Sequence, residues 1–155
     1  MLGYKRDLLE VLKFELRFLQ KGGYGRLPRA SWRAPFIFED SPICVNYGAP
    51  GDRAPCSECW LMQFVPAERQ SEKSPCRHVP LDAAGQTLNT LYAYGAGKQK
   101  EIEEVLETWL KTRIQRLEQE RSNASSAETN ANATAIAFAS VIASEGNSSA
   151  SPWPR

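Results

Sequence analysis

With 155 residues, the chain has room for one domain of ordinary size with a single core. Its 19 Lys and Arg residues nearly balance its 18 Asp and Glu residues, so no overall charge indicates a nucleic acid or a membrane surface as partner. Charges interrupt the N-terminal segment where a secretion signal needs an apolar core, and no run reaches the roughly 18 apolar residues of a membrane span. We therefore expect a soluble, cytoplasmic protein without a membrane partner.

Two long amphipathic helices are predicted, over residues 4–21 and 98–121. In the first, leucines repeat at helical spacing, and valine and phenylalanine widen the apolar stripe before Gly22-Gly23 ends the helix. In the second, apolar residues from Ile102 to Leu117 recur at the same spacing, with acids crowded into the first turns and bases into the last. Apolar arcs this broad predict two helices that pack against other parts of the chain.

One charged residue interrupts each apolar arc. Glu15 lies inside the arc of the first helix, and Arg113 lies in the middle of the arc of the second. The two helices are expected to pack together, with Glu15 meeting Arg113 or another arginine in a partly buried pair. Such a pair specifies the register of two helices more readily than it adds stability.

Residues 21–35 carry several basic side chains and no acid, with aromatic rings between them. Bases of a single-stranded nucleic acid stack on rings while cations meet its phosphates, so this segment is a candidate contact. The residues concerned are Arg26, Arg29, Arg33, Tyr24 and Trp32. The alternative is a solvated connecting loop whose aromatic residues pack back on the core.

The middle of the chain is rich in proline, with eight prolines from Pro28 to Pro80. Proline excludes long helices and central strands, so only short strands are predicted here, over residues 35–38, 60–65 and 77–81, with a short helix over 87–92. This is too little regular structure to hold roughly 50 residues together by hydrogen-bond ladders. The predicted fold is α+β: two long amphipathic helices packed on a proline-rich, strand-poor region that a cysteine metal site closes.

All four cysteines and the only histidine fall within residues 44–78, with the spacing C-x11-C-x2-C-x16-C-x-H. In a reducing compartment such clustering favours metal or thiol chemistry over disulfides. The segment Cys56-Ser57-Glu58-Cys59 supplies two zinc ligands at the correct separation, and it resembles the C-x-x-C turns of zinc-knuckle and zinc-ribbon proteins.

The remaining ligands should come from more distant parts of the chain. Cys76 is the natural third ligand, and the fourth is either Cys44 or His78, because residues two apart on an extended segment point to the same side. We prefer the all-thiolate set for a structural zinc ion, with His78 as an alternative ligand. An iron–sulfur cluster would use the same four thiolates.

Two catalytic interpretations compete with the structural one. Cys56 and Cys59 could form a redox dithiol, although such pairs usually begin a helix and a strand is predicted here. Cys76 could act as a nucleophile with His78 as its base. A third alternative is four buried thiols with no ion.

Residues 122–155 are rich in Ser, Asn and Ala and cannot bury enough apolar surface to fold alone, so a disordered tail is predicted after a single domain over 1–121. Residues 133–143 form a more apolar stretch within this tail. The sequence favours a zinc-stabilised, non-catalytic binding or adaptor module that contacts a protein or a single-stranded nucleic acid. The alternative is a thiol-based redox protein or enzyme that uses Cys56/Cys59 or Cys76/His78.

Overall fold

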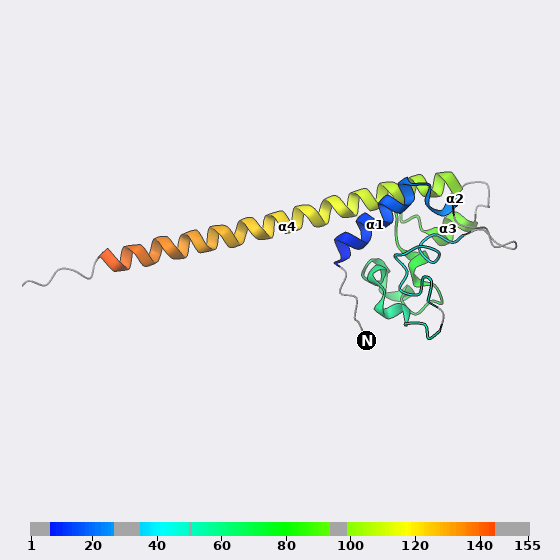
Figure 1. Ribbon diagram of the computed structural model, residues 1–155, viewed down its shortest axis with the longest axis horizontal. Coiled ribbons are helices and arrows are strands. Elements are labelled where there is room, and N and C mark those ends of the chain that lie inside the picture. Colours follow the sequence, from blue (N-terminus) through cyan, green and yellow to red (C-terminus); the bar gives the residue numbers. More distant parts are fainter. Residues whose placement is uncertain (1–6, 27–34, 50, 94–98, 145–155) are drawn as a thin grey trace, which may run out of the picture. The chain divides into compact units, whose positions relative to one another are not determined.

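The computed structural model describes residues 7–26, 35–49, 51–93 and 99–144, the last of these with side chains as far as residue 137 (Figure 1). The chain divides into two compact units, Met1–Arg116 and Leu117–Arg155. The first unit holds the core and every described residue of the predicted site. The second unit consists, in its described part, of the continuation of one long helix.

The first helix, α1, spans Leu8–Gln20 and confirms the predicted helix within the described residues. Asp7 caps it, since its side chain accepts a hydrogen bond from the backbone N–H of Leu9 at 3.4 Å. Gly22, at φ 94°, reverses the chain after the helix, as expected for a left-handed residue beyond a helix end. A single short helix, α2 (Gly23–Arg26), follows directly.

Between residues 35 and 93 the described chain is built from turns and short helices. Four are 3-10 helices: η1 (Cys56–Glu58), η2 (Trp60–Phe64), η3 (Ala67–Arg69) and η4 (Pro75–His78). The predicted short helix is present as α3 (Leu88–Ala93). Thr87 caps α3 by accepting from the N–H of Thr90 at 3.2 Å, while Thr90 Oγ1 accepts from the N–H of Thr87 at 3.0 Å.

The long helix α4 spans Gln99–Ser144, and its part in the first unit buries one face in the core. Leu106 and Leu110 are completely buried, and the ring of Trp109 meets those of Phe64 and Phe38 edge to face at centroid distances of 5.4 and 6.0 Å. Edge-to-face packing of this kind adds about 0.5–1.5 kcal/mol beyond area burial. The second predicted amphipathic helix is thereby confirmed as a core element.

The predicted α+β class is wrong, because the described residues form helices and turns and no strand. The segment Trp60–Val65 shows the reason. A strand was predicted over residues 60–65, but the segment folds as the 3-10 helix η2, with Leu61 and Val65 deeply buried. The N–H groups of Met62 and Val65 bond to carbonyls three residues earlier, so the backbone of this segment is satisfied locally and needs no partner strand. The other two predicted strands are a turn at 37–40 and the helix η4 with the extended residues after it.

The predicted pairing of Glu15 with Arg113 is also wrong. Glu15 is completely buried and accepts hydrogen bonds from the hydroxyl groups of Tyr24 and Ser41, the latter at 2.9 Å. The guanidinium carbon of Arg113 lies 5.1 Å from the ring centroid of Phe64 and thus over an aromatic face. The charged residue in each apolar arc therefore has partners other than the one predicted.

In the second unit, α4 continues where the composition predicted a disordered tail. Every described side chain from Glu118 to Ala137 is exposed. A helix without packing depends on local terms alone and is marginal in water. The disorder predicted for 122–155 remains a prediction. None of the helices in the described ranges combines the length and the apolar character that a membrane crossing requires.

Deleting residues 122–155 is expected to leave the folded part of the first unit as stable as in the full chain. The described side chains of that segment are exposed, and surface changes usually alter the free energy of unfolding by no more than about 0.5 kcal/mol. Urea denaturation of the full and shortened chains measures the difference. A loss of more than about 1 kcal/mol would mean that the deleted residues pack on the first unit.

Candidate functional site

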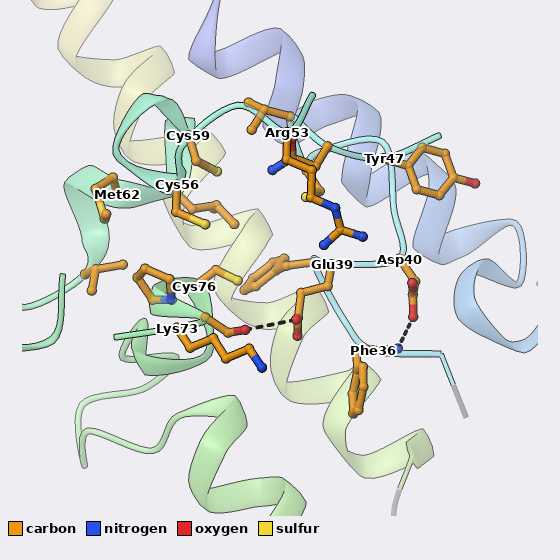
Figure 2. A pocket seen from close by; sticks show the side chains of 18 of the residues that line it. Phe36, Glu39, Asp40, Tyr47, Arg53, Cys56, Cys59, Met62, Lys73 and Cys76 are labelled. Carbon is orange, nitrogen blue, oxygen red and sulfur yellow. Dashed lines mark hydrogen bonds between the residues drawn. The ribbon is translucent and has the colours of Figure 1, made fainter. Parts of the chain in front are cut away.

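A cavity of about 380 Å³ in the first unit brings the four cysteines together (Figure 2). Cys44 comes from the loop after residue 41, Cys56 and Cys59 from the C-x-x-C turn, and Cys76 from η4. All four are thiols rather than disulfides. Apolar side chains such as Phe36, Leu61 and Val65 form much of the remaining wall. Three segments separated in sequence therefore meet at one thiol-lined cavity.

The C-x-x-C segment folds as a tight turn. The backbone N–H of Cys59 donates to the carbonyl of Cys56 at 3.0 Å, and the N–H of Met62 donates to the carbonyl of Cys59 at 3.0 Å. These bonds place the second cysteine between η1 and η2, and the buried side chain of Leu61 anchors the turn to the core. Cys56 is exposed, whereas Cys59 is half-buried. The turn thus holds two thiols at the rim of the cavity.

Cys44 is placed by hydrogen bonds on both sides. Its N–H donates to the carbonyl of Ser41 at 3.0 Å, and its carbonyl accepts from the N–H of Tyr47 at 3.1 Å. The side-chain amide of Asn46 donates to the carbonyl of Ala54 at 3.0 Å. This last bond links the loop that carries Cys44 to the segment that leads into the C-x-x-C turn.

Cys76 is positioned through its neighbours, which are held by one carboxylate. Glu39 accepts from Ser74 Oγ at 3.1 Å and from Arg77 Nε at 2.6 Å, so both sides of Cys76 are fixed to the turn at residues 37–40. The guanidinium of Arg77 also lies 4.2 Å from the ring centroid of Phe36. This clamp joins η4 to the loop that precedes Cys44.

Burial raises the pKa of three of the thiols, and it raises that of Cys76 to about 12. Backbone N–H groups oppose the rise by donating toward the sulfur atoms: that of Asn46 toward Cys44, and those of Leu61 and Val45 toward Cys59. The negative charges of the other three thiolates also raise the pKa of Cys76. At neutral pH Cys44, Cys59 and Cys76 are therefore protonated thiols. Binding of a cation would release these protons and leave thiolates.

The prediction that a metal site closes this region is not met as stated. Among the described residues, no three His, Cys, Asp or Glu side chains form a group that could hold a metal ion where they now lie. The chemistry of the donor set nevertheless fits zinc: four soft sulfur donors line one cavity, and backbone N–H groups are directed at two of them. Binding one ion would require these sulfur atoms to draw closer together.

His78 does not line the cavity, although it lies only two residues after Cys76. The predicted extended segment would have pointed both side chains to one side. In the observed 3-10 helix η4, side chains point the same way every three positions, so side chains two positions apart point in different directions. The cavity thus brings together Cys44, Cys56, Cys59 and Cys76 and leaves His78 outside. The same divergence disfavours Cys76 and His78 as a nucleophile and base.

The proposed nucleic-acid contacts are only partly described. Tyr24 is buried, with an exposed fraction of 1%, and its hydroxyl accepts from the N–H of Phe38 at 2.9 Å. Its ring is therefore unavailable for stacking on a base. Arg26 ends α2, and Arg29, Trp32 and Arg33 lie outside the described residues.

Sequence reasoning missed the charged residues around the thiols. The pattern at Glu39 and Asp40 indicates only a turn before Pro42, and Arg53 and Lys73 belong to no motif, yet all four line the cavity. Arg53 lies three residues before Cys56, which is the one local signal that could have drawn attention to it. None of the family models, curated proteins or solved structures compared with this chain matches it, so the site is interpreted from its own geometry.

Proposed function

We propose that this chain is a zinc-stabilised binding module without catalytic activity, in which Cys44, Cys56, Cys59 and Cys76 hold the ion. The observation that carries the proposal is the meeting of these four thiols, from three separate segments, at one cavity. When bound, zinc would supply a cross-link between the segments and would act as a structural ion with four sulfur ligands. A thiol-rich protein of this kind suits a reducing compartment such as the cytoplasm.

The folding problem of the middle segment supports the proposal. Between residues 51 and 81 the described regular structure consists of 3-10 helices of three to five residues. Such helices have poor hydrogen-bond geometry and contribute little stability of their own. Metal binding contributes folding free energy where a segment lacks it, because the site does not exist in the unfolded chain.

The protonation of the thiols argues against a catalytic role for them. Nucleophilic cysteines need a lowered pKa, whereas burial raises that of Cys44, Cys59 and Cys76. Of the two partner classes, a protein is favoured over a single-stranded nucleic acid, because Tyr24 is buried and offers no ring for stacking.

Metal analysis of the purified chain tests the proposal. Protein prepared under reducing conditions is expected to contain one zinc per chain, and its four thiols should react with a thiol reagent only after a chelator is added. Titration of the metal-free chain with cobalt should give the intense sulfur-to-metal absorption of four thiolates. A folded chain without metal and with reactive thiols would contradict the proposal. If the purified chain contains iron and absorbs visible light, the four thiols hold an iron–sulfur cluster in place of zinc.

A redox dithiol is the second candidate, and the exposure of Cys56 one turn from Cys59 favours it. This role requires a reversible disulfide between the two cysteines, with two electrons passed to an oxidant and two protons released. Mass spectrometry after oxidation and reduction distinguishes the roles. A metal-free chain that cycles between these states supports the redox role, whereas zinc-protected thiols that resist oxidation exclude it.

A further inference from the structure

Two cationic side chains, Arg53 and Lys73, line the thiol cavity. Arg53 precedes the C-x-x-C turn, and Lys73 precedes η4, so the two belong to different segments. Figure 2 shows the guanidinium of Arg53 directed into the cavity, on the side of Glu39. Neither cation forms an ion pair or a hydrogen bond within the part of the chain that the structure describes.

The acidic residues of the cavity do not account for these cations. Glu39 is held by Ser74 and Arg77, with its two oxygens each accepting one hydrogen bond. Asp40 accepts from the backbone N–H of Phe36 at 2.6 Å and takes part in further interactions. Arg53 and Lys73 thus line a cavity whose carboxylates are already engaged.

Four thiolates around a zinc dication leave a net charge of minus two. Such a charge is costly beside apolar walls unless opposite charges lie near it. We propose that Arg53 and Lys73 are the counter-charges of a four-thiolate zinc site, and that they raise its affinity for zinc and slow the release of the ion. The inference rests on the proposed function and extends it to residues that bind no metal themselves.

The test compares zinc affinity among charge variants of the full chain. Arg53→Gln and Lys73→Gln are each expected to weaken zinc binding about tenfold, the lower end of the range for groups that support metal ligands. The double variant should be weaker than either single variant, and Arg53→Lys should restore most of the affinity. Competition with a chromophoric chelator gives the affinity, and the rate of zinc transfer to it gives the release rate.

Salt and a matched variant separate charge from structure. Because Arg53 and Lys73 are exposed, their effect should shrink between about 0.01 M and about 1 M salt, where the screening length falls from about 30 to 3 Å. Arg69→Gln removes an exposed arginine of η3 that pairs with Glu72 and does not line the cavity, so it should bind zinc like the wild type. The cobalt spectrum should keep its four-thiolate form in all variants.

The possible failures are distinguishable. A wild-type chain that binds zinc, with a double variant that binds it within twofold, overturns this inference and leaves the proposed function standing. Loss of affinity that Arg53→Lys does not restore and that salt does not alter also overturns it, because the role would then be one of packing. A wild-type chain that binds no zinc overturns both.

Discussion

Replacing Cys44 with serine is expected to abolish the stabilisation that zinc gives this chain, whereas replacing His78 with glutamine is expected to leave it intact. Cys44 lines the cavity with the other three thiols, and its sulfur receives the N–H of Asn46. His78 lies on η4 but outside the lining. The two variants therefore decide the identity of the fourth ligand, which the spacing of the sequence left open.

The expected size of the effect follows from mass action. Zinc at a thousandfold excess over its dissociation constant stabilises a folded chain by about 4 kcal/mol. Wild type and His78→Gln should lose about this amount when a chelator removes the ion, and Cys44→Ser should lose little, because it has little to lose. Urea denaturation with and without chelator measures the free energy of unfolding in each case.

The metal-free variants supply the control for this comparison. Serine differs from cysteine by one atom, and Cys44 is only half-buried, so Cys44→Ser and wild type should be similar in stability when both lack zinc. If instead Cys44→Ser retains the zinc effect and His78→Gln loses it, the ion is held by Cys56, Cys59, Cys76 and His78. The cavity would then have to rearrange around η4 on binding.

The sequence predicted the elements whose signal is local and repeated. α1 and the buried part of α4 follow from leucine and isoleucine at helical spacing, since burial of one helix face imposes that period. It also predicted that the four cysteines come together, because a rare residue type is concentrated in a proline-rich segment that regular structure alone could not hold together, and all four line one cavity. The metal at this site stays a prediction.

The parts that the sequence did not predict depend on contacts between distant residues. Glu39 meets Ser74 and Arg77 across 35 and 38 positions, and no local pattern records such a contact. The segment Trp60–Val65 was misassigned because a short apolar run does not distinguish a strand from a helical segment by its periodicity, and its backbone forms the 3-10 helix η2. The ring of Tyr24, a predicted stacking surface, is buried against Phe18, and its hydroxyl donates to Glu15 on another helix.

Glu15 explains why a carboxylate interrupts the apolar arc of α1. It accepts hydrogen bonds from Tyr24 and Ser41, and Tyr24 in turn accepts from the N–H of Phe38. Phe38 has a positive φ of 67°, which is strained for a bulky side chain and persists only where the surroundings enforce it. The network therefore fixes the turn that carries Glu39 and leads to Cys44.

Substituting Glu15 with alanine is expected to destabilise the chain by about 3 kcal/mol. The change leaves two buried hydroxyl groups without their acceptor and opens a void beside them, and each unsatisfied buried group costs about 1–3 kcal/mol. Glu15→Gln keeps the shape and one acceptor, so a smaller loss of about 1 kcal/mol is expected. Glu10→Gln, at an exposed position of the same helix, should change little.

The pH dependence of stability separates the effect of the titrating carboxyl group of Glu15 from the effect of its side-chain shape. Burial raises the pKa of Glu15 above its usual 4.5, and the hydrogen bonds from Tyr24 and Ser41 only partly oppose the rise. The folded chain therefore keeps a proton that the unfolded chain releases. This contribution to stability is fully present below about pH 4.5 and is lost as the pH rises through the folded-state pKa.

The advantage of wild type over Glu15→Gln in free energy of unfolding should therefore shrink as the pH rises from 4.5 and level off above the folded-state pKa. Urea denaturation of both chains at matched pH and zinc concentration gives this difference, in which other titrating groups cancel. Ser41→Ala removes a hydrogen bond that lowers the pKa of Glu15. In this variant the loss of stability with rising pH should therefore continue to a higher pH than in the wild type. A difference that grows with pH would mean that the ionised carboxylate, not the protonated acid, is the form that the fold stabilises.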